Sequence, residues 1–152
     1  MVKAPEREVV YVSCGLTGLP QEFVEAIKRV IDIIESRGHR MLRWTIINSS
    51  WTPAQIYRHD KQCASDCSVM LMICDERSTG MGMEFAFAIM RQIPILCVAR
   101  HGALITPMVL GACEVEPNVS MIRYGEVAEI PDIFNTFLLA VQRGRKQAVL
   151  AA

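Results

Sequence analysis

Two carboxylates and a tyrosine are the residues in this sequence whose types and spacing could do chemistry. Glu84 closes the small-residue stretch "STGMGME", and Asp60 lies in "YRHDKQ", near the apolar stripe of a predicted helix. A carboxylate in a first helical turn is ordinarily a partner of the helix dipole, but an acid on an apolar stripe must be paired, neutralised or functional. Together with Tyr11 from an early strand, the two carboxylates suit the cleavage of a glycosidic bond.

Two stretches rich in small residues follow predicted strands: "CGLTGLP" at 14–20 and "RSTGMGM" at 77–83. Glycines let backbone amides approach a phosphate or a sugar, and helix N-termini favour anions. In an open parallel sheet, ligands bind outside the carboxyl ends of the strands, where such loops gather. The alternative, two tight turns without a ligand, stays open at this point, because glycine is common in any strand-to-helix turn.

Short apolar runs alternate with segments of helical period along the chain, which predicts crossover units and a parallel sheet. The expected strands are 9–15, 40–47, 68–75, 93–99 and 119–125, and the expected helices are 21–38, 54–66, 83–92, 107–112 and 131–146. The run 68–75 is apolar throughout and should be central. We therefore expect an α/β fold, a single-domain Rossmann-like (flavodoxin-like) three-layer arrangement with a five-stranded, mostly parallel sheet.

Composition narrows the class of function. The 152 residues fit a single domain spanning 1–152, with mobile ends at about 1–7 and 146–152. Because the formal net charge is zero, neither a nucleic acid polymer nor a membrane surface is an expected partner, and a small molecule is favoured. The start of the chain lacks a hydrophobic signal core, and no apolar run approaches the roughly 18 residues needed to span a bilayer.

The cysteines predict neither disulfides nor a metal site. Cys14, Cys74 and Cys97 sit in apolar strand-like runs, which indicates reduced core residues and a cytoplasmic protein. His59, Cys63 and Cys67 follow one another at helical spacing, but three ligands along one helix cannot easily close round a tetrahedral zinc. We expect no metal and no cofactor.

At this point the chain resembles the nucleoside 2-deoxyribosyltransferase family, and within it the branch that hydrolyses 2′-deoxynucleoside 5′-monophosphates. The resemblance covers nearly the whole chain. It comprises Tyr11 with "CGLTG", the Asp of "YRHDKQ", "STGMGME" with Glu84 placed 24 residues after Asp60, "IPILCVAR", and "ITPMVLGA" leading to a strand and a final helix. The spacing from Asp to Glu together with Ser-x-Gly-x-Gly-x-Glu is the specific part of the match.

The resemblance implies a role for each matching residue. Glu84 corresponds to the nucleophile that forms a glycosyl ester, Asp60 to the acid that protonates the departing base, and Tyr11 to the tyrosine beside both carboxylates. The implied substrate contacts are Cys14, Gly15, Leu16, Thr17, Gly18, Ser78, Gly80, Gly82 and Thr106. Thr106 would reach the phosphate across the interface of a homodimer, and Tyr11 would favour 2′-deoxy substrates.

One departure concerns the phosphate. The resembled hydrolases carry an Arg in the first loop where this chain has Thr17, and Arg77, beside Ser78, could replace it. Two rival functions share the pocket: a transferase that moves deoxyribose between bases, and a non-catalytic nucleotide-binding module. An acid pair beside an anomeric carbon has little use in a pure binder. The sequence names neither the base nor the phosphate state of the substrate.

Overall fold

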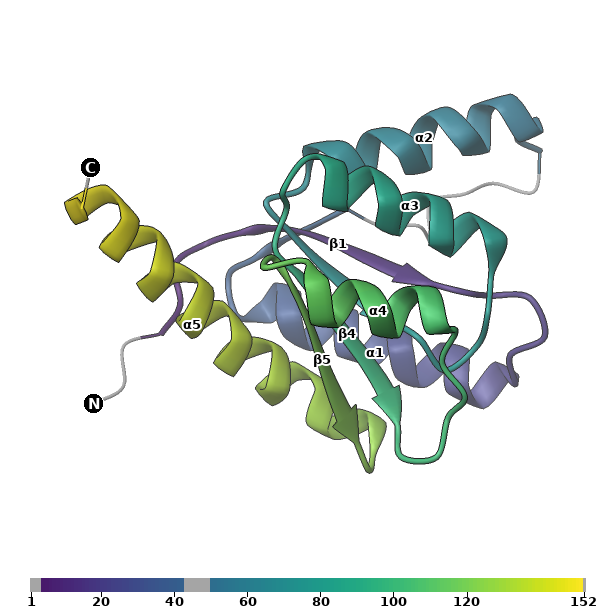
Figure 1. The fold of residues 1–152 in the computed structure, drawn as a ribbon. Coiled ribbons are helices and arrows are strands. Elements are labelled where there is room, and N and C mark those ends of the chain that lie inside the picture. Colours follow the sequence, from purple (N-terminus) through teal and green to yellow (C-terminus); the bar gives the residue numbers. More distant parts are fainter. Residues whose placement is uncertain (1–3, 43–49, 152) are drawn as a thin grey trace.

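A computed structural model describes residues 4–42 and 50–151, and in them strands alternate with helices (Figure 1). The strands are β1 (Val9–Cys14), β2 (Arg40–Leu42), β3 (Val69–Ile73), β4 (Ile95–Arg100) and β5 (Val119–Tyr124). The helices are α1 (Gln21–Ser36), α2 (Pro53–Asp66), α3 (Thr79–Met90), α4 (Pro107–Val115), the 3₁₀ turn η2 (Val127–Glu129) and α5 (Ile130–Ala151). The predicted α/β alternation is confirmed.

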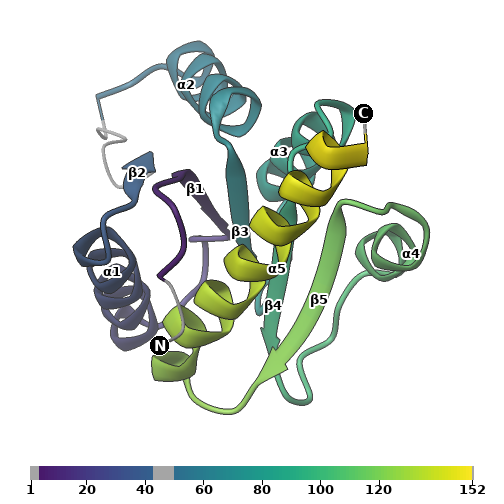
Figure 2. The same ribbon diagram turned by 90° about the vertical axis from the view of Figure 1, so that its left-hand side faces the viewer.

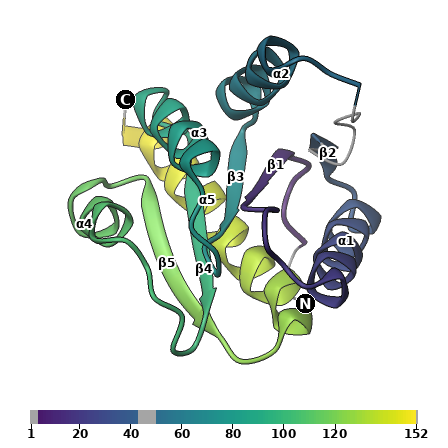
Figure 3. The same ribbon diagram turned by 90° about the vertical axis from the view of Figure 1, so that its right-hand side faces the viewer.

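The five strands form one sheet in the order β2-β1-β3-β4-β5, and every neighbouring pair is parallel. This is the flavodoxin-like strand order. Helices α1 and α5 cover one face, and α2, α3 and α4 cover the other, so that α5 passes in front of the sheet in Figure 2 and behind it in Figure 3. The chain changes face between β1 and β3, and the loops that follow these two strands diverge there, which is where such folds bind ligands.

Local sequence signals account for the helices that were predicted well. In α1, the apolar face Ile27, Val30, Ile31 and Ile34 is buried against the sheet. In α2, Thr52 is the N-cap: its hydroxyl accepts from the Gln55 amide at 3.3 Å, and the Gln55 side chain accepts from the Thr52 amide at 2.8 Å. This reciprocal capping satisfies two backbone donors that a helix start leaves without partners.

The start of α3 differs from the sequence prediction. The helix begins at Thr79 rather than at residue 83, because Ser78 caps it and its hydroxyl accepts from the Met81 amide at 3.3 Å. Gly80 and Gly82 therefore belong to the helix and not to a loop, and Glu84 lies in the second helical turn. With its orphan donor satisfied, the helix tolerates two glycines near its N-terminus, at a modest cost in backbone entropy.

Other helix and strand boundaries also differ from the sequence prediction. Helix α4 runs to Val115 rather than 112, and α5 continues to Ala151, past the predicted end at 146. Strand β2 is described as Arg40–Leu42, and the rest of the predicted strand 40–47 lies outside the described residues. As predicted, β3 is central and every residue of it is buried. None of the helices in the described ranges is long and apolar enough to cross a membrane.

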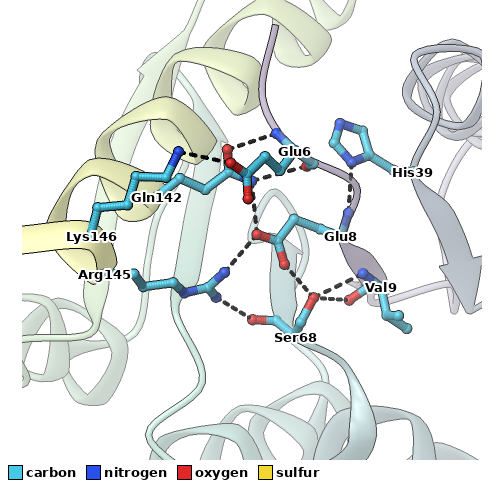
Figure 4. Close-up of polar contacts among 8 residues, drawn as sticks. All are labelled: Glu6, Glu8, Val9, His39, Ser68, Gln142, Arg145 and Lys146. Carbon is cyan, nitrogen blue, oxygen red and sulfur yellow. Dashed lines mark hydrogen bonds and ion pairs between the residues drawn. The ribbon is translucent and has the colours of Figure 1, made fainter. Parts of the chain in front are cut away.

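A buried polar cluster ties α5 to the start of β1 (Figure 4). Glu8 is buried, and its carboxylate accepts from Arg145 Nη1 at 2.6 Å, Ser68 Oγ at 2.6 Å and Gln142 Nε2 at 2.9 Å. Burial raises the pKa of Glu8, but the hydrogen bonds from Ser68 and Gln142 and the charge of Arg145 outweigh it, so the net pKa is lower than usual. The cluster anchors β1 at the end of the sheet opposite to the candidate site.

Candidate active site

Strand β1 presents Tyr11 and Ser13 on one face. The two residues are separated by one position, so the alternation of a strand directs both side chains to the same side of the sheet. Each is 1% exposed, and pairing with β3 fixes their heights, with Tyr11 opposite Met70 and Ser13 opposite Met72. The face that they share is the one covered by α2 and α3, which carry the two carboxylates.

Ser13 contacts the predicted nucleophile directly, because its hydroxyl donates a short hydrogen bond to Oε2 of Glu84. The sequence analysis did not single out Ser13. The signal that could have found it is its spacing from Tyr11: a small polar residue on an otherwise apolar strand, two positions after a predicted site residue, must face the same side of the sheet.

The electrostatics of Glu84 combine opposing influences. Burial, the largest influence, raises its pKa, the Ser13 hydrogen bond lowers it, the charge of Asp60 raises it, and a hydrogen bond from Tyr11 lowers it, with a net pKa of about 7. Burial and the charges of Glu84 and Asp60 raise the pKa of the Tyr11 phenol as well, so the phenol stays protonated and can donate. The structure thus brings Tyr11, Asp60 and Glu84 into electrostatic contact, and it adds Ser13 to them.

Asp60 is half-buried on α2, and its partner is His59, which the sequence analysis considered only as a metal ligand and rejected in that role. Nδ1 of His59 lies 3.0 Å from Oδ1 of Asp60, and the His59 ring packs edge-on against Trp51 with ring centroids 5.2 Å apart. His59 Nε2 also lies 3.7 Å from Sγ of Cys63. Within residues 4–42 and 50–151, no group of three or more His, Cys, Asp or Glu side chains could hold a metal ion.

The predicted substrate contacts Ser78, Gly82 and Thr106 line one pocket of about 290 Å³ at the carboxyl edge of the sheet, together with Arg77. Ser78 caps α3 and Thr106 caps α4, where its hydroxyl accepts from the Met108 amide at 3.3 Å. Two helix N-termini, each with a partial positive charge, therefore border the same pocket. That Thr106 reaches the phosphate of a partner subunit, as the resemblance implies, stays a prediction.

The loop after β1 lies against the loop after β3. A Cβ added at Gly15 would come 3.1 Å from Cβ of Ser78 and 3.4 Å from the carbonyl oxygen of Glu76, so a larger residue would push the two loops slightly apart. Gly18 turns the chain with a φ of +83°. Cys14 is half-buried, and burial raises the pKa of its thiol to about 12. Leu16, Thr17, Gly18 and Gly80 are exposed.

The chain is similar in sequence to known proteins. No protein-family model matches the chain. A protein of Methanosarcina mazei with the provisional name 2′-deoxynucleoside 5′-phosphate N-hydrolase 1 is 26% identical over 133 residues, covering 83% of this chain and 77% of the relative. A relative from Methanococcoides burtonii with the same name is 26% identical over 109 residues, covering 67% of this chain and 88% of its own. These relatives support the resemblance to the nucleoside 2-deoxyribosyltransferase family.

Solved structures with the same fold include both types of enzyme in that family. The Clostridium botulinum CMP N-glycosidase BcmB superimposes with a TM-score of 0.67 at 16% identity, over 84% of this chain and 98% of that one. A 2-deoxyribosyltransferase of Bacillus psychrosaccharolyticus superimposes with a TM-score of 0.60 at 11% identity, over 81% and 90% of the two chains. The expected fold is thereby confirmed, as is the resemblance to the nucleoside 2-deoxyribosyltransferase family.

Proposed function

We propose that this protein hydrolyses the N-glycosidic bond of (2′-deoxy)nucleoside 5′-monophosphates to a free base and (deoxy)ribose 5-phosphate. The observation that carries the proposal is the half-buried carboxylate of Glu84, which Ser13 holds beside the charge of Asp60. Close to α3, on which Glu84 lies, is a pocket bordered by two capped helix N-termini. An acid pair and, along the same helix α3, a pocket at two helix N-termini suit a substrate with a glycosidic bond and a phosphate.

The reaction follows from these groups. In the reactive state the acid pair holds one proton, which Asp60 carries while Glu84 is charged. An oxygen of Glu84 attacks C1′ of the sugar, the bond from C1′ to the base nitrogen breaks, and Asp60 passes its proton to the departing base. Water then adds to C1′ from the side that the base has left, Asp60 takes its proton, and the ester bond to Glu84 breaks. The sugar retains its configuration, and both carboxylates return to their starting state.

Support for the phosphate comes from the pocket that contains Ser78 and Thr106. Backbone amides at the start of α3 and the two hydroxyls offer hydrogen bonds, and Arg77 supplies a cation. The start of α4 contributes the positive end of its dipole, because Pro107 has no N–H and the Met108 amide donates to Thr106. We assign Arg77 the place of the arginine that the first loop lacks at Thr17. A charged donor beside helix N-termini favours a dianionic phosphate over a free hydroxyl.

One assay separates this function from its two rivals. The protein is incubated with matched nucleosides and 5′-monophosphates, with and without a second free base, and the products are separated by chromatography. We expect free base from monophosphates whether or not the second base is present. New nucleoside that appears only with the second base would identify a transferase. Unchanged substrate throughout, with retained binding, would identify a nucleotide-binding module.

We further propose that two copies of the chain associate through α4 and the edge strand β5. This surface exposes Leu104, Met108, Val115 and Ile122, and β5 lacks a neighbour on its outer side within the described sheet. Such an apolar surface next to an open strand edge favours a partner, and α4 also forms a wall of the Ser78 pocket, so the same contact would enclose that pocket.

Sedimentation velocity at assay concentration tests the association. Met108→Lys should shift the protein to the monomer, because Met108 is 82% exposed and a charge there would have to be buried in the contact. Val149→Lys is the matched control: Val149 is 76% exposed but lies on α5, which covers the other face of the sheet. A fully active wild-type monomer would contradict the dimer. The six cysteines are free, which supports the further proposal of a cytoplasmic location.

A further inference from the structure

Ser13 is a buried hydroxyl that the catalytic scheme leaves unused. It lies on β1 between two neighbouring strands, is 1% exposed, and is held by the register that pairs it with Met72 of β3. A buried hydroxyl needs a hydrogen-bond partner, and that of Ser13 donates to Oε2 of Glu84. The contact joins a rigid strand to the half-buried carboxylate of α3.

We propose that Ser13 is the positioning residue of Glu84: it holds Oε2, keeps the carboxylate in its charged form and leaves Oε1 as the oxygen that attacks the sugar. This role rests on the proposed function, in which Glu84 is the nucleophile. The positioning role requires a hydrogen-bond donor that moves little. A residue on β1, an inner strand of the sheet, meets this requirement better than a residue on a loop.

The charge of Glu84 explains why a donor is needed. Burial and the neighbouring charge of Asp60 both favour the neutral acid, which cannot act as a nucleophile. A hydroxyl that donates to the carboxylate favours the charged form, so Ser13 opposes both influences. Removing the Ser13 hydroxyl should raise the pKa of Glu84 further above the value of about 7 that it has with Ser13 in place.

Ser13 also bears on the second half of the reaction. When water adds to C1′, the bond between C1′ and Oε1 breaks, its electron pair returns to Glu84, and the proton of the water passes to Asp60. The Ser13 hydroxyl then donates to a carboxylate that is regaining its charge, and charge-assisted hydrogen bonds are stronger than neutral ones. Its loss should slow the release of sugar phosphate and allow the glycosyl ester to accumulate.

The experiment compares wild type, Ser13→Ala and Ser13→Thr by two readouts. The first is the titration of the Glu84 carboxyl carbon, followed by NMR in protein labelled at glutamate Cδ and assigned with Glu84→Gln. The second is the pH profile of kcat/KM. In Ser13→Ala we expect the titration midpoint and the acid limb of the profile to rise together by about one pH unit, which lowers kcat/KM about tenfold at pH 6. Ser13→Thr keeps the hydroxyl and should restore both.

Val12→Ala is the matched control, because Val12 neighbours Ser13 on β1 but faces the other side of the sheet. This substitution should leave the Glu84 titration and the acid limb of the kcat/KM profile unchanged. An unchanged Glu84 titration in Ser13→Ala would overturn the proposal. So would a titration that rises while the acid limb of the profile stays where it was. If wild type releases no base at all while the titration rises in Ser13→Ala, the proposed function fails, and the link between Ser13 and Glu84 stands.

Discussion

Nδ1 of His59 lies 3.0 Å from Oδ1 of Asp60, the residue that follows it on α2. The ring is held in turn by Trp51, at 5.2 Å between ring centroids, so the orientation of Asp60 depends on residues at the start of the same helix. One oxygen of the Asp60 side chain is engaged by the imidazole, and we therefore expect the proton that the departing base receives to come from the other oxygen, Oδ2.

Asp60→Asn should keep a side chain of the same shape beside His59 but remove the proton that Asp60 gives to the departing base. We expect kcat to fall about a hundredfold or more for bases that leave poorly and much less for bases that leave easily, because general acid catalysis matters most for poor leaving groups. Rates across a series of nucleotides with bases of graded basicity provide the measurement. A uniform loss across the series would show that Asp60 orients the sugar instead.

Glu84→Gln should remove activity and stabilise the protein at the same time. Loss of the nucleophile should lower kcat by about a thousandfold or more. The folded pKa of Glu84, about 7, lies above the unfolded value of 4.5, so wild type loses stability as the pH rises between these values. The variant lacks this loss and should gain about 1 to 3 kcal/mol at pH 8 and almost nothing at pH 4.5.

Urea unfolding of both proteins at pH 4.5 and pH 8 measures that difference, with product chromatography for the activity. If the variant and wild type differed in stability by the same amount at both pH values, burial would not raise the pKa of Glu84. The pH profile gives a second reading: with Glu84 as nucleophile, kcat/KM rises through about pH 7, whereas with Glu84 as the proton donor it would fall there.

Arg77→Gln should weaken the use of monophosphates selectively. We expect KM for a 5′-monophosphate to rise about tenfold at low salt, with little change for the matching nucleoside, since a charge-assisted contact to the phosphate is lost. Arg91→Gln is the control, because Arg91 is equally exposed but lies at the opposite end of α3. An identical effect of the two substitutions would place the phosphate away from Arg77.

Glu8→Gln should lower stability in a manner that depends on pH. The folded pKa of Glu8 is lower than its unfolded value of 4.5, so its contribution is present above pH 4.5 and is lost as the pH falls through the folded pKa. We expect a loss of about 1 to 3 kcal/mol at pH 7 that vanishes in acid. Lys146→Ala, which breaks the exposed pair with Glu6, should cost about 0.5 kcal/mol or less. Equal losses from the two variants would contradict the buried role of Glu8.

Tyr11→Phe should relax a preference for 2′-deoxy substrates and slow the reaction, because the phenol donates to Glu84. The discrimination rests on one hydroxyl, so the change in the ratio of kcat/KM for matched deoxy and ribo monophosphates should be about tenfold to a hundredfold. A ratio that stays the same in the variant would remove Tyr11 as the discriminating residue.

Local sequence signals, such as helix-capping residues, were sufficient to predict most of the helices and strands. Thr52, Pro53 and Gln55 define the start of α2 within four positions of the chain, and α2 was predicted accurately. The start of α3 was missed, because Gly80 and Gly82 are typical of loops and the compensation by the Ser78 cap depends on the backbone geometry. Local signals do not give the order of the strands in the sheet, because it depends on pairing between segments that are distant in the sequence.

The site was harder to predict than the fold, because its residues meet only after folding. Tyr11, Asp60 and Glu84 were proposed from residue type and from a family resemblance, and the structure brings them into electrostatic contact. Ser13 and the contact between His59 and Asp60 were missed. His59 was weighed as a metal ligand through its spacing to Cys63, while its closer partner is the next residue in the chain. Side-chain direction decides such contacts, and sequence spacing alone does not give it.

The position of β1 within the sheet affects how the protein folds during synthesis. Val10 pairs with Met41 on one side and with Val69 on the other, so the strand that carries Tyr11 and Ser13 is made long before its second neighbour. Closing so long a loop slows folding, because the entropy is lost before the strand contacts form. Until β3 emerges from the ribosome, β1 presents an apolar, unpaired edge that can pair with other chains, and nascent chains halted before Val69 should be strong clients of chaperones.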